Sequence, residues 1–182
     1  WVSSQHWRFS SEERILEKIK LAKKSVIEVL FHGGVANEYF NEIKKMAKHV
    51  VGYKVYLSET TGGLTLNEKN LSATLEAIAK TNRTTVFHAD ETQQTIKELI
   101  NLSNKLKAKL HIAHVSRAST INLLNGNVTY EVTPHHLSFD STDVKKNKLL
   151  TVNPPIGTKS DRQAVLNALK NGKVGILATD HA

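Results

Sequence analysis

Short apolar segments alternate with longer amphipathic ones along most of the chain. The apolar segments are rich in β-branched residues and predict strands at residues 25–31, 50–57, 84–89, 109–115, 128–133 and 174–179, with a weaker one at 149–153. Apolar residues at helical spacing predict helices from Ser11 onwards and at residues 36–49, 67–82, 92–107, 117–125 and 159–171. Strands that alternate with helices in this way pair in parallel, with helices on the faces of the sheet.

The number of strands decides which parallel fold to expect. Six well-marked strands and one weaker strand exceed a five-stranded flavodoxin-like sheet, and no strand is followed by a G-x-G-x-x-G turn. We therefore predict an α/β fold, a (β/α)₈ TIM barrel. A complete barrel usually takes about 200 residues or more. With 182 residues, the chain is expected to be one partial barrel domain, residues 1–182, that lacks the first strand region and the C-terminal end.

Composition narrows the function classes. The chain is 40% hydrophobic and 23% charged, as in an ordinary globular domain, and it has no long apolar run, signal peptide or lipidation motif. These features predict a cytoplasmic protein without a membrane partner. The chain has no cysteine and nine histidines. Any metal site would therefore use His, Asp, Glu or a modified Lys.

The formal charge of +8 raises the question of a nucleic-acid partner. Most of the lysines, however, lie in stretches interleaved with glutamate, at residues 12–24, 41–48 and 97–109. This pattern is typical of solvated helix faces, and basic segments with interleaved aromatic residues are absent. We predict no nucleic-acid partner, and a small anionic substrate would also be favoured by the positive charge.

Four residues with metal-binding or acid–base chemistry lie in or after predicted strands. Lys54 lies inside an apolar strand, where a free ammonium is costly to bury. His88, His114 and Asp180 come at or near the ends of three other strands, where barrel enzymes place their catalytic groups. Each residue alone is typical of a hydrogen-bonded structural group, but together they favour a metal site. Imidazoles and a carboxylate can bind Zn²⁺, and Lys54 could join them once CO₂ had converted its amine to a carbamate.

Several segments of the chain resemble those of the dihydroorotase family, in the amidohydrolase superfamily. They are Gly52-Tyr-Lys-Val-Tyr-Leu-Ser-Glu-Thr60, His111-Ile-Ala-His-Val-Ser116, Glu131-Val-Thr-Pro-His-His-Leu137 and Val152-Asn-Pro-Pro155, followed by Ala178-Thr-Asp-His-Ala182. The likeness spans residues 26–182 and is to the type with a lysine-bridged binuclear zinc centre. Pro134-His-His-Leu137 resembles dihydroorotases more than allantoinases or hydantoinases.

The resemblance implies a role for six residues. Lys54 would be the carboxylated ligand that bridges the metals, and His88 and His114 would bind one zinc ion. Asp180 would be both a metal ligand and the catalytic general base. Asn153 would contact the substrate, and Thr60 would lie in a loop that closes over it. One or two Zn²⁺ ions would bind in each subunit.

The implied reaction interconverts N-carbamoyl-L-aspartate and L-dihydroorotate in pyrimidine biosynthesis, so the partner would be a small anion. The resemblance also allows a homodimer. Two alternatives stay open: another cyclic amidohydrolase, of the dihydropyrimidinase, hydantoinase or allantoinase kind, and a non-catalytic dihydroorotase-like scaffold subunit. The scaffold reading arises because the family's His-x-His pair is absent before Ser25. His32 and His136 are interpreted as structural or supporting residues, and His111 as an ordinary strand residue.

Overall fold

The computed structural model describes residues 10–58, 65–124 and 128–180. Its strands form one sheet in which every neighbouring pair is parallel and the spatial order follows the chain. They are β1 (His32–Val35), β2 (Gly52–Tyr56), β3 (Thr84–His88), β4 (Leu110–Ile112), β5 (Val128–Val132) and β6 (Ile176–Leu177). Parallel strands that follow one another around the sheet are the arrangement of a (β/α) barrel. The carboxyl ends of these strands therefore lie at the same edge of the sheet.

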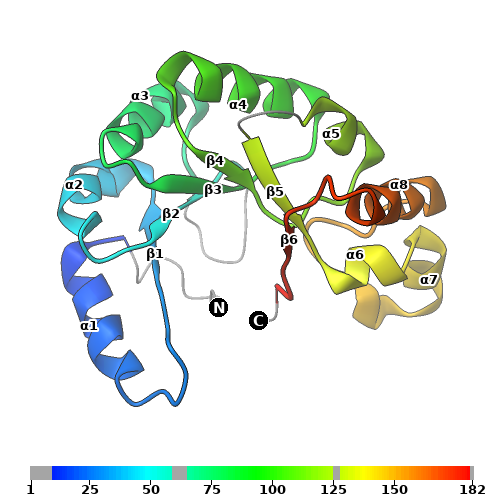
Figure 1. The fold of residues 1–182 in the computed structure, drawn as a ribbon, viewed down its shortest axis with the longest axis horizontal. Helices are drawn as coiled ribbons and strands as arrows, with labels where there is room; N and C mark the ends of the chain where they lie inside the picture. The colour runs from blue at the N-terminus through cyan, green and yellow to red at the C-terminus, as the bar shows by residue number, and fades with distance from the viewer. Residues whose placement is uncertain (1–9, 59–64, 125–127, 181–182) are drawn as a thin grey trace.

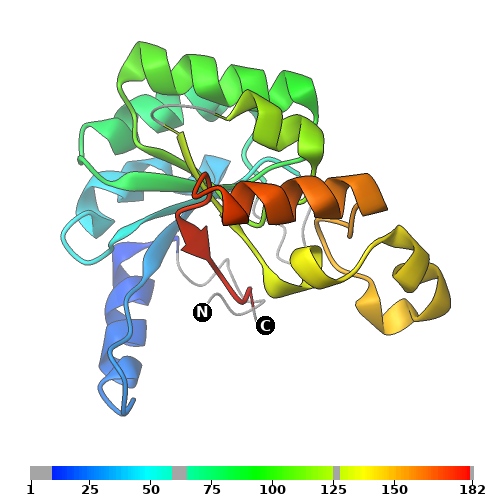
Figure 2. The same ribbon diagram turned by 45° about the vertical axis from the view of Figure 1, so that its right-hand side comes forward.

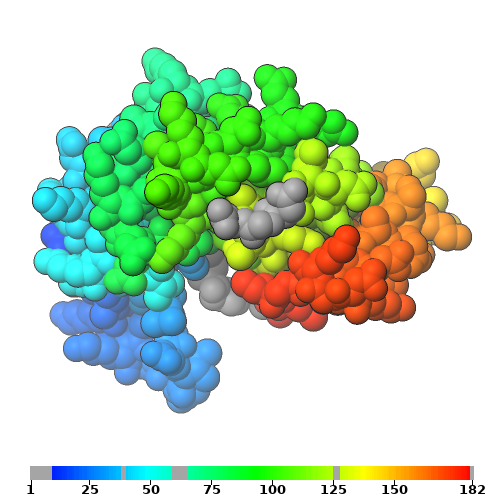
Figure 3. All heavy atoms as spheres, turned by 45° about the horizontal axis from the view of Figure 1, so that its top comes forward, coloured from blue at the N-terminus to red at the C-terminus, as the bar shows by residue number. Residues whose placement is uncertain are grey.

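The helices are α1 (Glu12–Ala22), η2 (Asn37–Glu42), α2 (Ile43–Met46), α3 (Glu68–Ala79), α4 (Gln93–Leu106), α5 (Ala118–Leu123), α6 (Pro134–Ser138), α7 (Ser141–Lys146), η3 (Lys148–Leu150) and α8 (Lys159–Lys170). Of these, α2, α3, α4, α5 and α8 cover the outer face of the curved sheet (Figure 1). Along the outside, α2 contacts α3, α3 contacts α4, α4 contacts α5, and α5 contacts α8. Figure 3 shows this outer layer with α4 across its upper part and α8 beside it.

The hydrophobic core lies between the sheet and the outer helices. Tyr53, Val55 and Phe87 alternate with inward-facing residues along β2 and β3, and all three are fully buried. They belong to one cluster with apolar residues of the helices, among them Leu75 of α3 and Leu99 of α4. Alternation along a strand separates the two faces of the sheet, so the apolar positions pack outward against the helices.

The inner face of the sheet carries polar side chains. In the sheet register Lys54 lies beside Val86, Val86 beside His111, and His111 beside Thr129. All four residues line a cavity of about 510 Å³ that β6 also borders. Bulky branched residues usually fill the interior of a TIM barrel. The polar lining here places groups with chemical function on the inner face of the sheet.

The strand predicted at residues 25–31 is wrong. This segment forms no strand, and Val26 and Ile27 are largely exposed. Figure 2 shows α1 and the chain that follows it projecting from the rest of the molecule. The first strand is β1, which begins at His32 and contains two glycines. A Cβ atom at Gly33 would lie 3.2 Å from both Met46 and Tyr53, so glycine lets the strand approach these side chains.

The weak strand predicted at residues 149–153 is also wrong. This segment begins with the short helix η3, and Leu149 is 92% exposed. The Asn147 side chain accepts a hydrogen bond from the Leu149 backbone N–H and so favours a turn. Two prolines follow, one after a cis Asn153–Pro154 bond, and proline has no N–H for a sheet.

The predicted helix at residues 36–49 is divided into η2 and α2. Within the described ranges, no helix combines the length and apolarity needed to cross a bilayer.

Candidate active site

Two buried histidines meet at the carboxyl edge of the sheet. His88 is the last residue of β3, and His114 follows β4 by two positions. The Nδ1 atom of His88 lies 2.9 Å from the Nε2 atom of His114, and the rings meet edge to face with centroids 4.6 Å apart. Burial, together with the positive charge of Lys54, lowers the pKa of His114 to about 2. His114 is therefore neutral at physiological pH, which is the form that can bind a metal ion.

Asn153 contacts the other ring nitrogen of His88. Its Nδ2 atom lies 3.3 Å from the Nε2 atom of His88. The two ring nitrogens of His88 thus have different partners, and which of them donates depends on the tautomer of the ring. The predicted substrate-binding residue and the two predicted metal ligands thus form one chain of contacts.

Two of the predicted site residues have unusual backbone conformations. His114 has a φ of 42° and Asp180 a φ of 48°, in the left-handed region that non-glycine residues rarely adopt. Such conformations need support from the surrounding structure, and they cluster at active sites and ligand-binding segments. His114 lies two residues after β4 and Asp180 three residues after β6, so the backbone turns sharply just beyond the ends of these strands.

Lys54 and Asp180 line the same interior cavity. The Nζ atom of Lys54 lies 5.4 Å from the centre of the Tyr56 ring. Burial lowers the pKa of Lys54 to about 8, although the negative charges of Glu131 and Asp180 oppose this shift. Burial also raises the pKa of Asp180 above its ordinary value, against the opposite effect of Lys54 and His135. An amine that deprotonates readily and a carboxyl group that protonates readily therefore share one cavity.

Glu131 and His111 form a further polar pair in this cavity, and neither stands out in the sequence as a site residue. The Nε2 atom of His111 lies 3.1 Å from Oε2 of Glu131, and its Nδ1 atom lies 2.9 Å from Oγ1 of Thr129. Burial alone would raise the pKa of Glu131, but the hydrogen bond with His111 and the nearby positive charges lower it overall. The alternation of Thr129 and Glu131 with apolar residues along β5 is the sequence signal that reveals this inner face.

His136 supports the segment that carries Asn153. Its Nδ1 atom lies 2.7 Å from Oγ1 of Thr133, and its Nε2 atom lies 3.2 Å from the carbonyl oxygen of Pro154. A carbonyl only accepts, so Nε2 of His136 donates to Pro154. His136 is buried and contacts the chain next to Asn153, in line with the structural or supporting role that the sequence suggests. Thr60, the other predicted substrate-binding residue, lies outside the described residues.

The described side chains provide some of the ligands that a zinc ion needs. His88 and His114 provide two neighbouring imidazoles, and a carboxylated Lys54 would add an oxygen ligand of the kind that zinc accepts. Among the residues that the structure describes, no three His, Asp or Glu side chains come close enough to hold a metal ion. Completing a zinc site would require the modified lysine or ligands beyond the described ranges.

Sequence comparison relates the chain to dihydroorotases. No protein-family model matches it. It is 36% identical over 148 residues to the dihydroorotase of Pyrococcus abyssi, an alignment that covers 71% of this chain and 35% of that protein. It is 39% identical over 99 residues to the dihydroorotase of Pediococcus pentosaceus, which covers 50% of this chain and 23% of that protein. The chain thus spans about a third or less of these two relatives.

Structural comparison supports the same fold. An L-hydantoinase from Arthrobacter aurescens superposes with a TM-score of 0.85 and 20% identity, over 95% of this chain and 48% of that one. A dihydroorotase from Saccharomyces cerevisiae, solved with 5-fluoroorotic acid, superposes with a TM-score of 0.82 and 18% identity, over 94% of this chain and 58% of that one. At these identities the likeness shows the fold alone, which is an incomplete TIM barrel of the amidohydrolase type. The sequence matches and the fold together show that the chain belongs to the dihydroorotase family of amidohydrolases.

Proposed function

We propose that this chain carries part of the active site of a zinc-dependent dihydroorotase, which interconverts N-carbamoyl-L-aspartate and L-dihydroorotate. The observation that carries the proposal is the contact between His88 and His114 at the strand ends, on the same sheet whose inner cavity contains Lys54 and Asp180. The sequence matches to proteins named dihydroorotase favour this reaction over others that use the same fold.

The proposed zinc ligands are His88, His114, Asp180 and Lys54 in its carboxylated form, for one or two ions. When bound, zinc would polarise the amide carbonyl and lower the pKa of a water molecule to about 7. The low pKa of Lys54 supports its proposed modification, because only a neutral amine reacts with CO₂.

Asp180 is the proposed general base and acid. Its carboxylate would accept a proton from the attacking water and return it to the ring nitrogen when the amide bond breaks. Burial raises the pKa of Asp180, so its carboxyl group holds that proton more readily than an exposed aspartate would. In the reverse direction the same group would take the proton from the nitrogen that closes the ring.

Asn153 is proposed to bind the substrate through its amide, as is Thr60 through its hydroxyl. The substrate would be a small anion, which agrees with the formal charge of +8. That residues 1–182 form one domain, that the protein is cytoplasmic and that it forms a homodimer stay predictions.

The first alternative is a hydantoinase or a related cyclic amidohydrolase, since an L-hydantoinase shares the fold. To distinguish the two, protein expressed from the longest reading frame that contains this sequence would be loaded with zinc and bicarbonate. Its kcat/KM would then be measured for dihydroorotate, hydantoin and dihydrouracil. We expect dihydroorotate to be preferred by at least about 100-fold, the discrimination that unpaired polar groups in a binding site can produce. A preference for either other ring would reassign the substrate.

The second alternative is a non-catalytic scaffold subunit. The same experiment tests it, because a scaffold would open none of the three rings even when zinc is bound. The unusual backbone conformations of His114 and Asp180 argue against a scaffold, since strained residues of this kind cluster at functional sites.

A further inference from the structure

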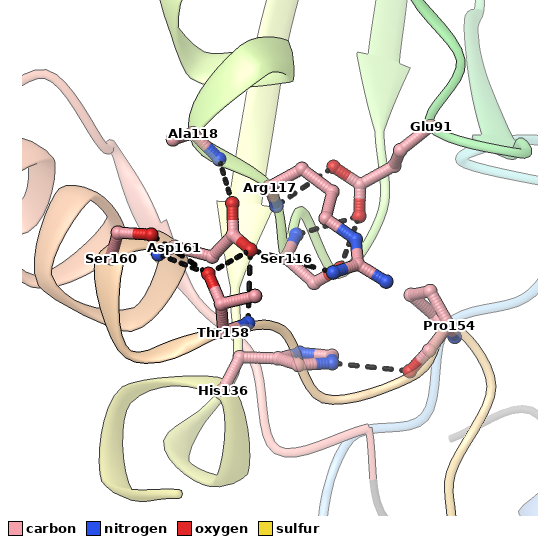
Figure 4. A network of polar contacts seen from close by, with 9 residues as sticks. All are labelled: Glu91, Ser116, Arg117, Ala118, His136, Pro154, Thr158, Ser160 and Asp161. Atoms are coloured by element: carbon pink, nitrogen blue, oxygen red, sulfur yellow. Dashed lines mark hydrogen bonds and ion pairs between the residues drawn. The ribbon is translucent and has the colours of Figure 1, made fainter. Parts of the chain in front are cut away.

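Two carboxylates hold the turn that follows His114 (Figure 4). Glu91, in the loop between β3 and α4, accepts hydrogen bonds from the backbone N–H of Ser116 at 2.7 Å, from its hydroxyl at 2.6 Å, and from the backbone N–H of Arg117 at 3.1 Å. Asp161, in the first turn of α8, accepts from the backbone N–H of Ala118 at 3.0 Å. Three consecutive N–H groups are thus bound by side chains from two distant segments.

The turn lies directly beside the candidate metal ligand. Ser116 is two residues beyond His114 and is 2% exposed. The residues on either side of His114 bond to neighbouring strands, the N–H of Ala113 to the carbonyl of Phe87 and the N–H of Val115 to the carbonyl of Glu131. Glu91 anchors the next two N–H groups. His114 therefore lies between backbone anchors on both sides, which maintain its positive φ angle.

Asp161 connects this turn to the segment that carries Asn153. Besides Ala118, its carboxylate accepts from the backbone N–H of Thr158 at 2.9 Å and from the Thr158 hydroxyl at 2.7 Å. A Cβ atom at Gly157 would lie only 2.9 Å from the carbonyl oxygen of Ser116, so the two segments pack backbone against backbone. Asn153 lies at the start of this segment and contacts His88.

We propose that Glu91 is a positioning residue for His114 and that Asp161 is a positioning residue for Asn153. Glu91 acts through the backbone of Ser116 and Arg117, close to His114. Asp161 binds the far end of the turn at Ala118 and acts through Thr158 and the chain that leads back to Asn153. The two carboxylates thus have separate roles. Glu91 fixes the geometry of the metal ligand His114, and Asp161 fixes the position of the substrate contact Asn153. This inference rests on the proposed role of His114 as a zinc ligand.

The first test measures zinc affinity by competition with a chromophoric chelator, in bicarbonate buffer, with protein from the longest reading frame that contains this sequence. Glu91→Gln keeps the shape of the side chain but replaces one acceptor oxygen with a donor that faces an N–H group. We expect zinc affinity to fall by about 10- to 100-fold, as when other groups that orient metal ligands are changed.

The matched control is Ser103→Ala. It removes a buried hydrogen bond of 2.8 Å, from the Ser103 hydroxyl to the Ala108 carbonyl near the opposite end of α4. Zinc affinity should stay within about twofold of the wild type, so a loss confined to Glu91→Gln is not a general effect of stability. Equal affinity in Glu91→Gln and Ser103→Ala would overturn the proposal. If Glu91→Gln does not fold, Ser116→Ala removes only the 2.6 Å bond and should still weaken zinc binding by about threefold.

Asp161→Asn tests the division of roles. We expect zinc affinity within about threefold of the wild type and a KM for dihydroorotate raised about tenfold, with a smaller change in kcat, because a lost substrate contact affects binding first. A loss of zinc affinity as large as that of Glu91→Gln would overturn the division.

The inference and the proposed function fail in different ways. A wild-type protein that binds zinc but opens no dihydroorotate would refute the proposed function and leave the Glu91 test intact. A wild-type protein that binds no zinc would overturn the proposal for Glu91 together with the metal site.

Discussion

Lys54 lies on the inner face of β2, and burial lowers its pKa to about 8. At pH 7 about a tenth of such amines are neutral, compared with about one in three thousand at the ordinary pKa of 10.5. Since CO₂ reacts only with the neutral amine, the fold makes this lysine far more available for carboxylation than an exposed lysine would be.

This pKa predicts how metal loading depends on pH. A lysine with a lowered pKa becomes neutral as pH rises, so the part of zinc uptake that requires bicarbonate should increase steeply from pH 6 to pH 8 and then level off. Below pH 8 the neutral fraction rises about tenfold per pH unit. Zinc content after loading with and without bicarbonate, at a series of pH values, measures this dependence.

Lys54→Ala is the control for this prediction. The variant should lose the bicarbonate-dependent part of its zinc at every pH. Normal zinc content in Lys54→Ala, or wild-type uptake that falls as pH rises, would show that Lys54 is not the bridging ligand.

At the scale of elements, β4 and β5 are joined inside the cavity by the contact between His111 and Glu131. Because the folded-state pKa of Glu131 is lowered, its carboxylate stabilises the fold above the ordinary pKa of about 4.5, and this stabilisation is lost as pH falls through the lowered value. Glu131→Gln should reduce the free energy of unfolding by about 1–3 kcal/mol at pH 7.

Urea unfolding at pH 7 and at pH 4 checks this prediction. The difference in stability between Glu131→Gln and the wild type should be smaller at pH 4 than at pH 7. A difference that stays constant or grows on acidification would contradict the stabilising role of the Glu131 carboxylate.

The packing of two loops near the site predicts the effect of a single methyl group. In Gly157→Ala the new Cβ atom would lie 2.7 Å from Cβ of Asp161 and 2.9 Å from a backbone oxygen, so the segments must separate. We expect a loss of about 1–3 kcal/mol in the free energy of unfolding. Gly175→Ala is the control, since its Cβ would meet no atom within 4 Å and should change stability by less than about 0.5 kcal/mol. Equal stability of the two variants would contradict this packing.

Elements with a clear pattern could be predicted from the sequence. Strands β2 and β3 alternate between apolar and inward-facing residues, and α4 presents Ile96 and Leu99 at helical spacing, so local periodicity identifies them. The segment at 25–31 has the composition of a strand but lies exposed, because pairing depends on neighbouring strands rather than on the segment alone. The prediction at 149–153 failed because side-chain capping at Asn147 and two prolines outweighed a short apolar run.

At the scale of the whole molecule, the sheet places residues from distant parts of the chain around one cavity. The strand pattern put His88 and His114 at or near strand ends, and the resemblance to dihydroorotases implied that they share one zinc ion. In the structure their rings are in contact, because parallel strands bring their carboxyl ends to one edge. The positions of Glu91, Asp161 and Glu131 could not be predicted in this way. Each of them binds at least one partner that lies 20 or more residues away in the chain, and only the packing of loops and strands reveals these contacts.

The described strands and helices correspond to about half of the solved hydantoinase and dihydroorotase chains that share the fold. The candidate ligands on this half are two imidazoles, a lysine and an aspartate, while no three His, Asp or Glu side chains among the described residues form a metal site. The proposed activity therefore belongs to the protein expressed from the longest reading frame that contains this sequence, and tests of activity need that protein.

The most direct test of the central claim is the rate of dihydroorotate ring opening by this protein, loaded with zinc and bicarbonate, compared with its Asp180→Asn variant. The account predicts turnover by the wild type and a loss of about 10²- to 10⁴-fold in kcat when the general base is removed, with the variant still folded. Full activity in Asp180→Asn would contradict the assignment of Asp180. An intact, zinc-loaded wild type that does not open the ring would contradict the dihydroorotase function itself.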